Sequence, residues 1–261
     1  MKTLITILGV FLVALMAQSA FAGGYALFDA PTDTISVSGN SVIGTAATIE
    51  ARVKIVNVAS SGGIVFNEFT AYQEDKLFAV RSNQTMYGYL FGNGNSAGFE
   101  SSAIVSWNTW HHIAYVYDGS QERFYLDGIK VSSRAASGDV YDYSSSIAAV
   151  GATNRGTVVG ASFEGLIDTL RVSTIARYTG DSFTAPTGDL TSDAYTNLLY
   201  NFDEPQNSTV VYDLSGNGRD GYLGIGNFAG ATSPTLVPEP TTMLLLGLGG
   251  LGLLGRKRSI A

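Results

Sequence analysis

The sequence contains no cysteine, and only 14% of its 261 residues are charged. The missing thiols exclude a disulfide framework and any reaction that needs a thiolate. Histidine is also scarce, because the chain has two, and these are the neighbours His111 and His112. Adjacent residues of a strand point to opposite faces, so these imidazoles cannot bind one metal ion together. Zinc chemistry is therefore poorly supported.

Positive charge is sparse in the body of the chain, where residues 23–236 hold 11 Lys and Arg against 21 Asp and Glu, a balance of −10. Residues 1–22 carry +1 and residues 237–261 carry +2, which brings the formal net charge to −7. An acidic body with dispersed cations offers no surface for a phosphate backbone. Nucleic acid is therefore not expected as a partner.

Residues 1–22 have the order of parts of a secretory signal peptide. Lys2 precedes the uncharged run 4–16, and Ala20-Phe21-Ala22 presents the small residues that signal peptidase accepts. The run is shorter than the ~20 apolar residues of a membrane span, which favours a cleaved signal over a retained anchor. We expect this chain to be exported.

The end of the chain combines a proline motif, an apolar run and a basic triplet. Val237-Pro238-Glu239-Pro240 is followed by the uncharged segment 241–255 and then by Arg256-Lys257-Arg258. Two prolines one residue apart keep the tetrapeptide extended, with Glu239 presented to a partner. As a helix the uncharged segment would be about 22 Å long, which suits a transient membrane anchor. The basic triplet would hold the end on the cytoplasmic side.

This order of parts resembles the PEP-CTERM sorting signal of Gram-negative bacteria. The resemblance implies recognition by an exosortase, transient insertion of the tail in the inner membrane, and delivery to the cell surface, the outer envelope or an extracellular matrix such as that of a biofilm. We therefore expect a signal peptide at 1–22, a folded domain at 23–230, a linker at 231–236, and a sorting tail at 237–261 with a short transmembrane segment at 241–255.

The middle of the chain has the period of two that is typical of half-buried strands. In segment 49–55 apolar residues alternate with charged ones, which predicts a strand with one face on a core and the other in water. The alternating residues are Ile49, Ala51, Val53 and Ile55 against Glu50, Arg52 and Lys54. Similar runs, separated by Gly, Asn, Asp and Ser, occur at 63–67, 76–81, 86–91, 102–107, 110–117, 122–126, 147–150, 163–173 and 197–202.

Asp127-Gly128 lies between two of these runs and predicts a hairpin, because a type I′ turn needs positive φ at both central residues. Segments with helical periodicity are not found in the middle of the chain. The sequence therefore predicts an all-β fold, an antiparallel β-sandwich jelly roll, with helices only in the N-terminal signal and the C-terminal apolar segment. His112 shares a strand face with Trp110, Ala114 and Val116, which predicts a buried, hydrogen-bonded histidine.

Several segments resemble a laminin-G-like domain of the concanavalin A-like jelly-roll superfamily. The matching segments are YALFD at 25–29, WHHIAYVYDG at 110–119, RFYLDG at 123–128 and GLIDTLRVS at 165–173. Segments 198–204 and 213–218 also resemble motifs of the family, but there they commonly precede the domain, so they either complete this sandwich or begin a second repeat. The family is functionally diverse, so the resemblance implies the fold and leaves the function open.

Tyr141, Asp142 and Tyr143 place two aromatic side chains beside acidic groups in a loop or edge strand. Sugars stack on aromatic faces and hydrogen-bond to carboxylates, so this segment is the first candidate for carbohydrate binding. The alternative is that these tyrosines are ordinary surface or core residues of the sandwich.

Calcium is the candidate cofactor. Asp213, Ser215 and Asn217 set oxygen atoms at positions 1, 3 and 5 of a turn with glycine at position 6, and Asp220 can add another oxygen. Position 12 is Gly224 in place of a bidentate glutamate. A plain turn stabilised by Asx hydrogen bonds is therefore the alternative.

Glu164 and Asp168 have the spacing of two carboxylates on one face of a strand, as in polysaccharide-cleaving enzymes. The E-x-D-x-x-E pattern of related glycosidases is absent, and Asp168 is expected on an apolar face, accepting hydrogen bonds near Arg171. We therefore expect a protein that is not an enzyme and that binds carbohydrate or another surface protein. A secreted polysaccharide-acting enzyme and a purely structural matrix component are the alternatives.

Overall fold

The computed structural model describes residues 23–39, 44–59, 62–69, 74–90, 92, 97–141, 147–154, 159–224 and 230–238. Its strands are β1 (Tyr25–Phe28), β2 (Ile35–Val37), β3 (Ala47–Val58), β4 (Gly63–Phe69), β5 (Glu74–Val80), β6 (Thr85–Leu90), β7 (Phe99–Ile104), β8 (Trp110–Tyr117), β9 (Gln121–Leu126), β10 (Ile129–Ala135), β11 (Ile147–Asn154), β12 (Val159–Ser173), β13 (Thr196–Tyr200), β14 (Val210–Val211), β15 (Gly221–Leu223) and β16 (Thr235–Val237). The two terminal helices expected from the sequence lie outside the described residues.

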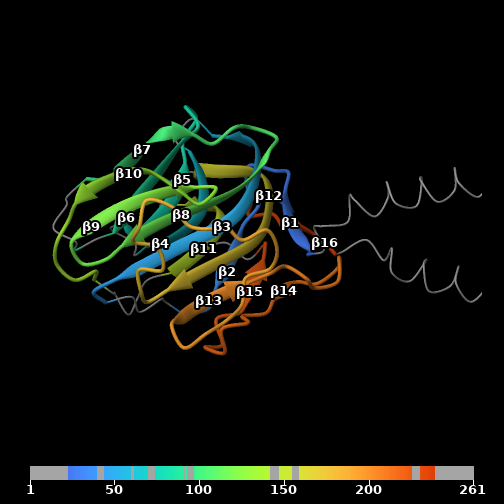
Figure 1. The fold of residues 1–261 in the computed structure, drawn as a ribbon. Helices are drawn as coiled ribbons and strands as arrows, with labels where there is room; N and C mark the ends of the chain where they lie inside the picture. The colour runs from blue at the N-terminus through green and yellow to red at the C-terminus, as the bar shows by residue number, and fades with distance from the viewer. Residues whose placement is uncertain are drawn as a thin grey trace, which may run out of the picture.

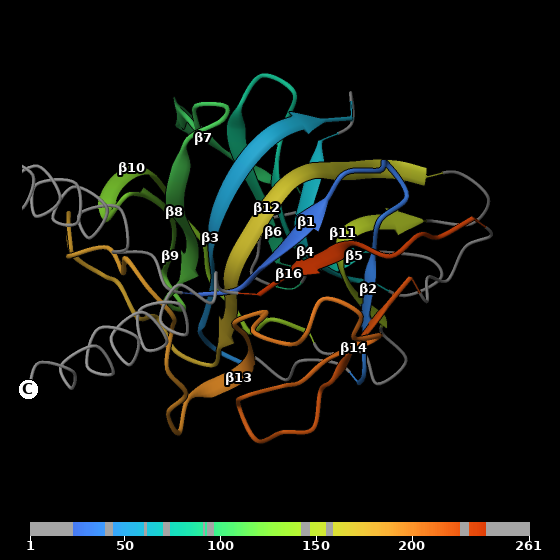
Figure 2. The same cartoon turned by 90° about the vertical axis from the view of Figure 1, so that its right-hand side faces the viewer.

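The strands form two antiparallel sheets that pack face to face (Figure 1). One sheet has the order β10-β9-β8-β3-β12, with β1 and β13 on the far edge of β12 and β16 on β1. The other has the order β7-β6-β5-β4-β11-β2-β15-β14. The first residues of β12 pair with β11, so this long, curved strand passes from one sheet to the other (Figure 2). The predicted all-β sandwich is confirmed.

Every segment predicted as a strand from its periodicity overlaps a strand of the structure. The predicted hairpin is also confirmed: Asp127 and Gly128 have φ values of 50° and 80°, and they join β9 to β10 with Leu126 opposite Ile129. These angles are those of a type I′ turn, which suits the twist of the flanking strands.

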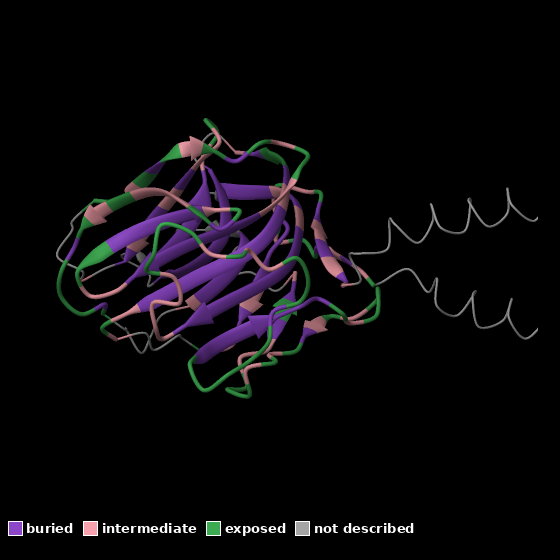
Figure 3. Ribbon diagram, in the orientation of Figure 1, coloured by how far each residue is buried: buried purple, intermediate pink, exposed green. Residues whose placement is uncertain are grey.

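The hydrophobic core lies between the two sheets, and β3, β8 and β12 are buried over most of their length (Figure 3). At its centre Phe124 stacks on Tyr115 and Phe99, with ring centroids 5.0 Å and 4.9 Å apart. The opposite sheet accommodates this stack at Gly88, where a Cβ would lie 2.6 Å from Tyr115 Cε1. Stacked rings of this kind add packing energy beyond their buried area.

The charged side of β3 does not face water, contrary to the prediction. Glu50 is 0% exposed and Arg52 is 6% exposed. The segment 174–195, which follows β12, covers this face, and its Tyr178 and Phe183 stack on each other and pack against β8 and β9. Alternation along a strand predicts which face packs on the core. It does not predict whether a later segment of the chain will bury the polar face.

The C-terminal strands complete the sandwich. β13 pairs with β12, β15 pairs with β2, and β16 pairs with β1, so that Val237 lies opposite Tyr25 and Leu236 opposite Ala26. Segments 198–204 and 213–218 therefore belong to this sandwich and do not begin a second repeat. Residues 231–236 are also not a free linker, because Leu236 is fully buried in the core.

Candidate functional site

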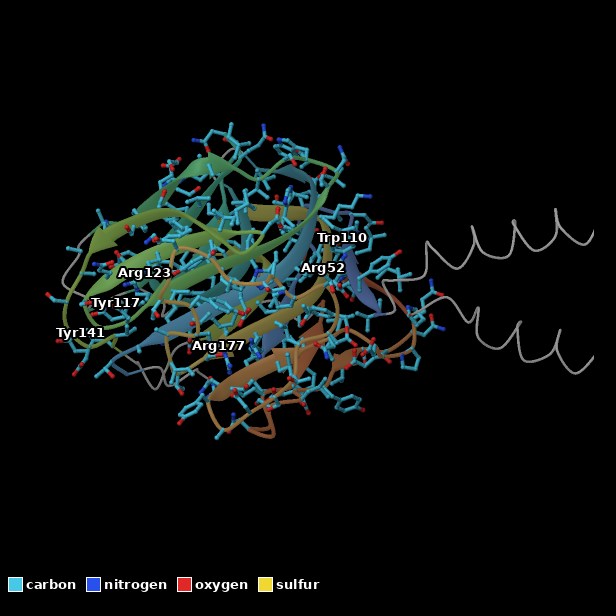
Figure 4. All side chains as sticks on the ribbon, viewed as in Figure 1. Arg52, Trp110, Tyr117, Arg123, Tyr141 and Arg177 are labelled. Carbon is cyan, nitrogen blue, oxygen red and sulfur yellow. The ribbon has the colours of Figure 1, made fainter. Side chains whose placement is uncertain are left out.

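The structure describes Tyr141 of the predicted carbohydrate-binding segment, whereas Asp142 and Tyr143 lie outside the described residues. Tyr141 is 58% exposed and lies at one end of the sandwich (Figure 4). Its ring rests on the backbone of Gly92, where a Cβ would come within 2.5 Å of Tyr141 Cδ2. The ring is thus held in place by the fold while more than half of the residue is exposed, which leaves surface for a ligand.

A second group of exposed aromatic side chains lies on β15 and directly after its partner strand β14. In this pair Val210 is opposite Tyr222 and Val211 is opposite Gly221. Val211 is fully buried, so the alternate positions Tyr222 and Tyr212 point away from the core, with exposures of 39% and 59%. The sequence analysis missed this pair because strands of two or three residues are too short to have a recognisable period.

Carboxylates lie close to this aromatic pair. Glu204 Oε1 accepts the backbone N–H of Tyr212 at 2.8 Å, which fixes the backbone from which the ring projects. Burial raises the pKa of Glu204, and the negative charges of Asp203 and Asp220 act in the same direction. Glu204 thus supports the backbone of Tyr212, and the exposed rings are the groups of this surface that can stack on sugar rings.

Asp213, a predicted calcium ligand, organises a turn by accepting four hydrogen bonds. Its Oδ1 accepts the N–H groups of Leu199 at 3.1 Å and Ser215 at 2.9 Å. Its Oδ2 accepts the N–H of Arg219 at 3.1 Å and the hydroxyl of Ser215 at 2.6 Å. Asp220 in turn accepts the N–H of Asp213 at 3.0 Å. This pattern is that of an Asx turn.

The same turn covers the outer edge of β13. The side-chain amide of Asn217 donates to the carbonyls of Thr196 and Asn197, both at 3.1 Å, and Leu214 N donates to Leu199 O at 2.9 Å. Backbone groups that would otherwise be unpaired at this edge are thereby satisfied. Among the described residues, no group of three or more His, Asp and Glu could hold a metal ion. Calcium binding stays a prediction.

The two histidines have separate partners on opposite sides of β8, as strand geometry predicted. His112 is 3% exposed, and its Nε2 lies 3.0 Å from Glu50 Oε2, so the buried, hydrogen-bonded histidine is confirmed. His111 contacts Ser106 and Asp127.

Glu50 lies at the centre of a buried polar network. Its Oε1 accepts two hydrogen bonds from Arg171, at 2.9 Å from Nε and 2.7 Å from Nη2, and its Oε2 accepts the hydroxyl of Tyr178 at 2.7 Å. Burial raises the pKa of Glu50, but the contacts with His112, Arg171 and Tyr178 outweigh this and leave the pKa below its ordinary value. The carboxylate is therefore ionised and fully engaged in structural contacts.

Asp168 and Glu164 have different partners on β3. A bulge between Ile167 and Thr169 turns Asp168 from the apolar face, where it was expected, to Arg52, with which it forms an ion pair. Burial raises the pKa of Asp168, whereas Arg52 acts in the opposite direction. Glu164 accepts a hydrogen bond from Asn57 at 3.2 Å. These are the contacts of structural carboxylates, not of a catalytic pair held on one substrate.

Arg52 also lies over the ring of Trp110, 4.6 Å from its centroid, and Figure 4 shows the two side chains together. This cation–π contact and the ion pair with Asp168 hold the guanidinium between β8 and β12. The outer face of the sheet is thus occupied by contacts within the protein.

The sorting motif begins inside the fold. Val237 is the last residue of β16, and Pro238 follows it without a backbone donor. The other predicted sorting residues, Glu239, Pro240, Arg256, Lys257 and Arg258, lie outside the described residues, as does segment 241–255. Within the part of the chain that the structure describes, no helix has the length and apolar character needed to cross a bilayer.

The fold is that of a lectin-type jelly roll, and the comparisons agree with it. Residues 29–181, more than half of the chain, match the concanavalin A-like lectin/glucanases superfamily in its laminin-G form. The chain belongs to this family. Residues 236–259 match the PEP-CTERM protein-sorting motif, which indicates an exported, surface-directed protein of a Gram-negative bacterium.

Among solved structures, the chain is similar to a protein of Bacteroides ovatus that is named as a candidate carbohydrate binding protein. The TM-score is 0.61 at 16% identity, and the match covers 77% of this chain and 58% of that protein. A SAP-like pentraxin from Limulus polyphemus has a TM-score of 0.47 at 16% identity, covering 60% of this chain and 78% of the pentraxin. The similarity to the Bacteroides protein shows the fold. No curated protein matches the sequence.

Glu50→Gln is expected to lower the free energy of unfolding by about 3–5 kcal/mol at neutral pH, because it leaves the buried Arg171 without its counter-charge. In the parent protein the pKa of Glu50 is lower in the folded state than its ordinary value of 4.5 in the unfolded state. Ionised Glu50 therefore contributes fully to the free energy of unfolding above pH 4.5, and this contribution is lost as the pH falls through the folded pKa. Urea unfolding from pH 7 to pH 3 measures both effects.

The variant should show a shallower loss of stability in acid than the parent protein. The matched control is Glu164→Gln, which removes a carboxylate that is only partly buried. If the Glu50→Gln variant and the parent lost stability equally in acid, Glu50 would not be the buried carboxylate that is ionised in the folded protein.

Asp213→Ala is expected to lower the free energy of unfolding by about 1–3 kcal/mol without any calcium, because it leaves the N–H donors of the turn unpaired. If the turn also binds calcium, millimolar Ca²⁺ should raise the unfolding midpoint by a few degrees, and the variant should lose this rise. A midpoint that calcium leaves unchanged in the parent protein would reject the metal site and leave the turn as an edge cap.

Proposed function

We propose that this protein is delivered to the cell surface or extracellular matrix and binds carbohydrate there, through exposed tyrosines on its sandwich. It binds carbohydrate and does not cleave glycosidic bonds. The observation that carries the proposal is the pair Tyr212 and Tyr222, two exposed rings of which one lies on β15 and the other directly follows its partner strand β14. The similarity to a protein named for carbohydrate binding supports the same role.

The geometry of the tyrosine pair suits a sugar chain. Because Tyr222 lies on β15 and Tyr212 directly follows β14, hydrogen-bonded strands and the contact with Glu204 fix both backbones. A rigid aromatic surface binds with little loss of conformational entropy. Tyr141, whose ring rests on Gly92, is the second candidate surface at the sandwich end.

Binding is favoured over glycosidic cleavage because the two strand carboxylates proposed for catalysis have protein partners. Asp168 is paired with Arg52, and Glu164 is hydrogen-bonded to Asn57. A glycosidase needs two carboxyl groups facing one bond, with room for sugar and water.

Sorting completes the proposed function. An exosortase would recognise the motif around Glu239, and delivery would place the sandwich at the outer surface or in the matrix, where polysaccharide is the abundant ligand. The match to the PEP-CTERM motif over residues 236–259 supports this route.

Replacing both Tyr212 and Tyr222 with Ala is expected to weaken glycan binding at least about tenfold, because each exposed stacking contact contributes on the order of 1 kcal/mol. A glycan array with the purified protein identifies the ligand, and calorimetry measures the affinity of each variant. Tyr195→Ala is the matched control, since Tyr195 is 52% exposed but lies in the turn before β13.

Tyr141→Ala tests the other surface in the same assay. Unchanged affinity of the Tyr212 and Tyr222 double variant, with loss in Tyr141→Ala, would move the site to Tyr141. Absence of binding to any glycan by the parent protein would refute carbohydrate recognition and favour a structural matrix role.

Chains that end at Pro238 and at Pro234 separate sorting from folding. Both lack the sorting tail and should be recovered in the culture medium, whereas the full chain stays with the cell or the matrix. Only the shorter one loses β16 and the burial of Leu236, which contributes about 2 kcal/mol, so only its unfolding midpoint should fall. Cell fractionation and thermal unfolding measure the two effects, and equal fractionation of all three chains would contradict sorting by the tail.

A further inference from the structure

A serine, a histidine and an aspartate form a hydrogen-bonded chain at the corner where β8 begins. Ser106 Oγ lies 2.7 Å from His111 Nε2, and His111 Nδ1 lies 2.7 Å from Asp127 Oδ2. The three residues come from the turn after β7, the start of β8 and the hairpin turn between β9 and β10. Their order of contacts is that of a nucleophile, a general base and the carboxylate that orients the base.

The carboxylate selects the tautomer of the imidazole. Ionised Asp127 can only accept hydrogen bonds, so the proton of neutral His111 lies on Nδ1. Nε2 is then an acceptor, and the hydroxyl of Ser106 donates to it. This is the protonation state in which an imidazole can remove the proton of a serine hydroxyl.

Backbone contacts hold all three groups in place. Asp127 Oδ1 accepts the N–H of His112 at 2.9 Å, and Asp127 occupies the left-handed position of the hairpin turn. After Ser106, the ring of Trp107 packs against the core, and Asn108 N donates to Ile55 O at 2.7 Å. The array therefore belongs to a rigid corner of the fold, and preorganisation of this kind is what nucleophilic catalysis requires.

The two ends of the array are open to solvent, whereas the side chain of His111 between them is 11% exposed, and the array has apolar neighbours along the chain. Ser106 is exposed, and the side chain of Asp127 is 51% exposed. Ile104, two residues before the serine, is 58% exposed, and Ile129, two residues after the aspartate, is 54% exposed. A group carried by a large molecule can reach such a surface, and apolar side chains favour an apolar acyl group.

We propose that Ser106 is a reactive nucleophile that hydrolyses carboxylic esters with apolar acyl groups, with His111 as general base and Asp127 as the positioning residue. Ser106 Oγ attacks the carbonyl carbon while its proton moves to His111 Nε2. The ester C–O bond breaks, the alcohol leaves with that proton, and the acyl group stays on Ser106. Water, deprotonated by His111, then releases the carboxylic acid and restores the hydroxyl. This activity is independent of the proposed carbohydrate binding.

The test uses the full chain, purified in mild detergent, with a fluorophosphonate probe and with p-nitrophenyl butyrate. The probe should modify Ser106, as located by peptide mass spectrometry, and the ester should be hydrolysed with turnover. Ser106→Ala should abolish both, and His111→Gln should slow both by at least about 100-fold.

Asp127→Asn distinguishes positioning from a merely structural role. Asparagine can still accept the N–H of His112 through its oxygen, so the variant should keep the unfolding midpoint of the parent protein. Nδ1 of His111 loses its carboxylate partner, so labelling of Ser106 by the probe should slow. Ser120 is the control serine, because its hydroxyl binds Asp118 at 2.8 Å in an exposed turn, and Ser120→Ala should label like the parent.

Equal labelling of Ser106 and Ser120, or labelling of Asp127→Asn at the parent rate, would overturn the proposal and assign the three residues to fixing the corner of the sandwich. Labelling of Ser106 without ester turnover would overturn the hydrolytic step.

Discussion

The buried carboxylate of Glu50 is the interaction on which the arrangement of this sandwich depends. It lies on β3 and binds Arg171 of β12, His112 of β8 and Tyr178 of the covering segment. A desolvated charge is tolerated only while its partners are all in place. The network therefore fixes the three central strands relative to one another and holds segment 174–195 against a face that would otherwise be wet.

The second constraint is the closure of sheet edges in a protein that has no disulfide to hold its ends. The turn built on Asp213 covers β13, and β16 pairs with β1. Both devices come from the C-terminal part of the chain, so the N-terminal strands are complete only once residues 196–237 have joined them. Exposed edges invite pairing with other chains, and these two devices cover the edges of β13 and β1.

The period of two was sufficient to predict β3–β9 and β11–β13, because it is a local property of the backbone. It was insufficient for the polar residues. Glu50 is buried by contacts with residues 62 to 128 positions away along the chain, and a single bulge redirected Asp168. Tyr141 was found from the aromatic and acidic residues around it in the sequence. Tyr222 lies on β15 and Tyr212 directly follows β14, and both strands are too short to have a pattern. Ser106, His111 and Asp127 are brought together only by the meeting of two turns.

The use of both faces of the β3 sheet explains where function can reside. Its inner face forms the core, and its outer face is occupied by the Glu50 network and by the contacts of Arg52 with Asp168 and Trp110. At the turns and short strands of the rim, in contrast, side chains are exposed but their backbones are held by the sandwich. Tyr141, the tyrosines of β14 and β15, and the corner at Ser106 all occupy such positions. When functional side chains lie on loops and short strands that a rigid scaffold positions, the same fold can serve many functions.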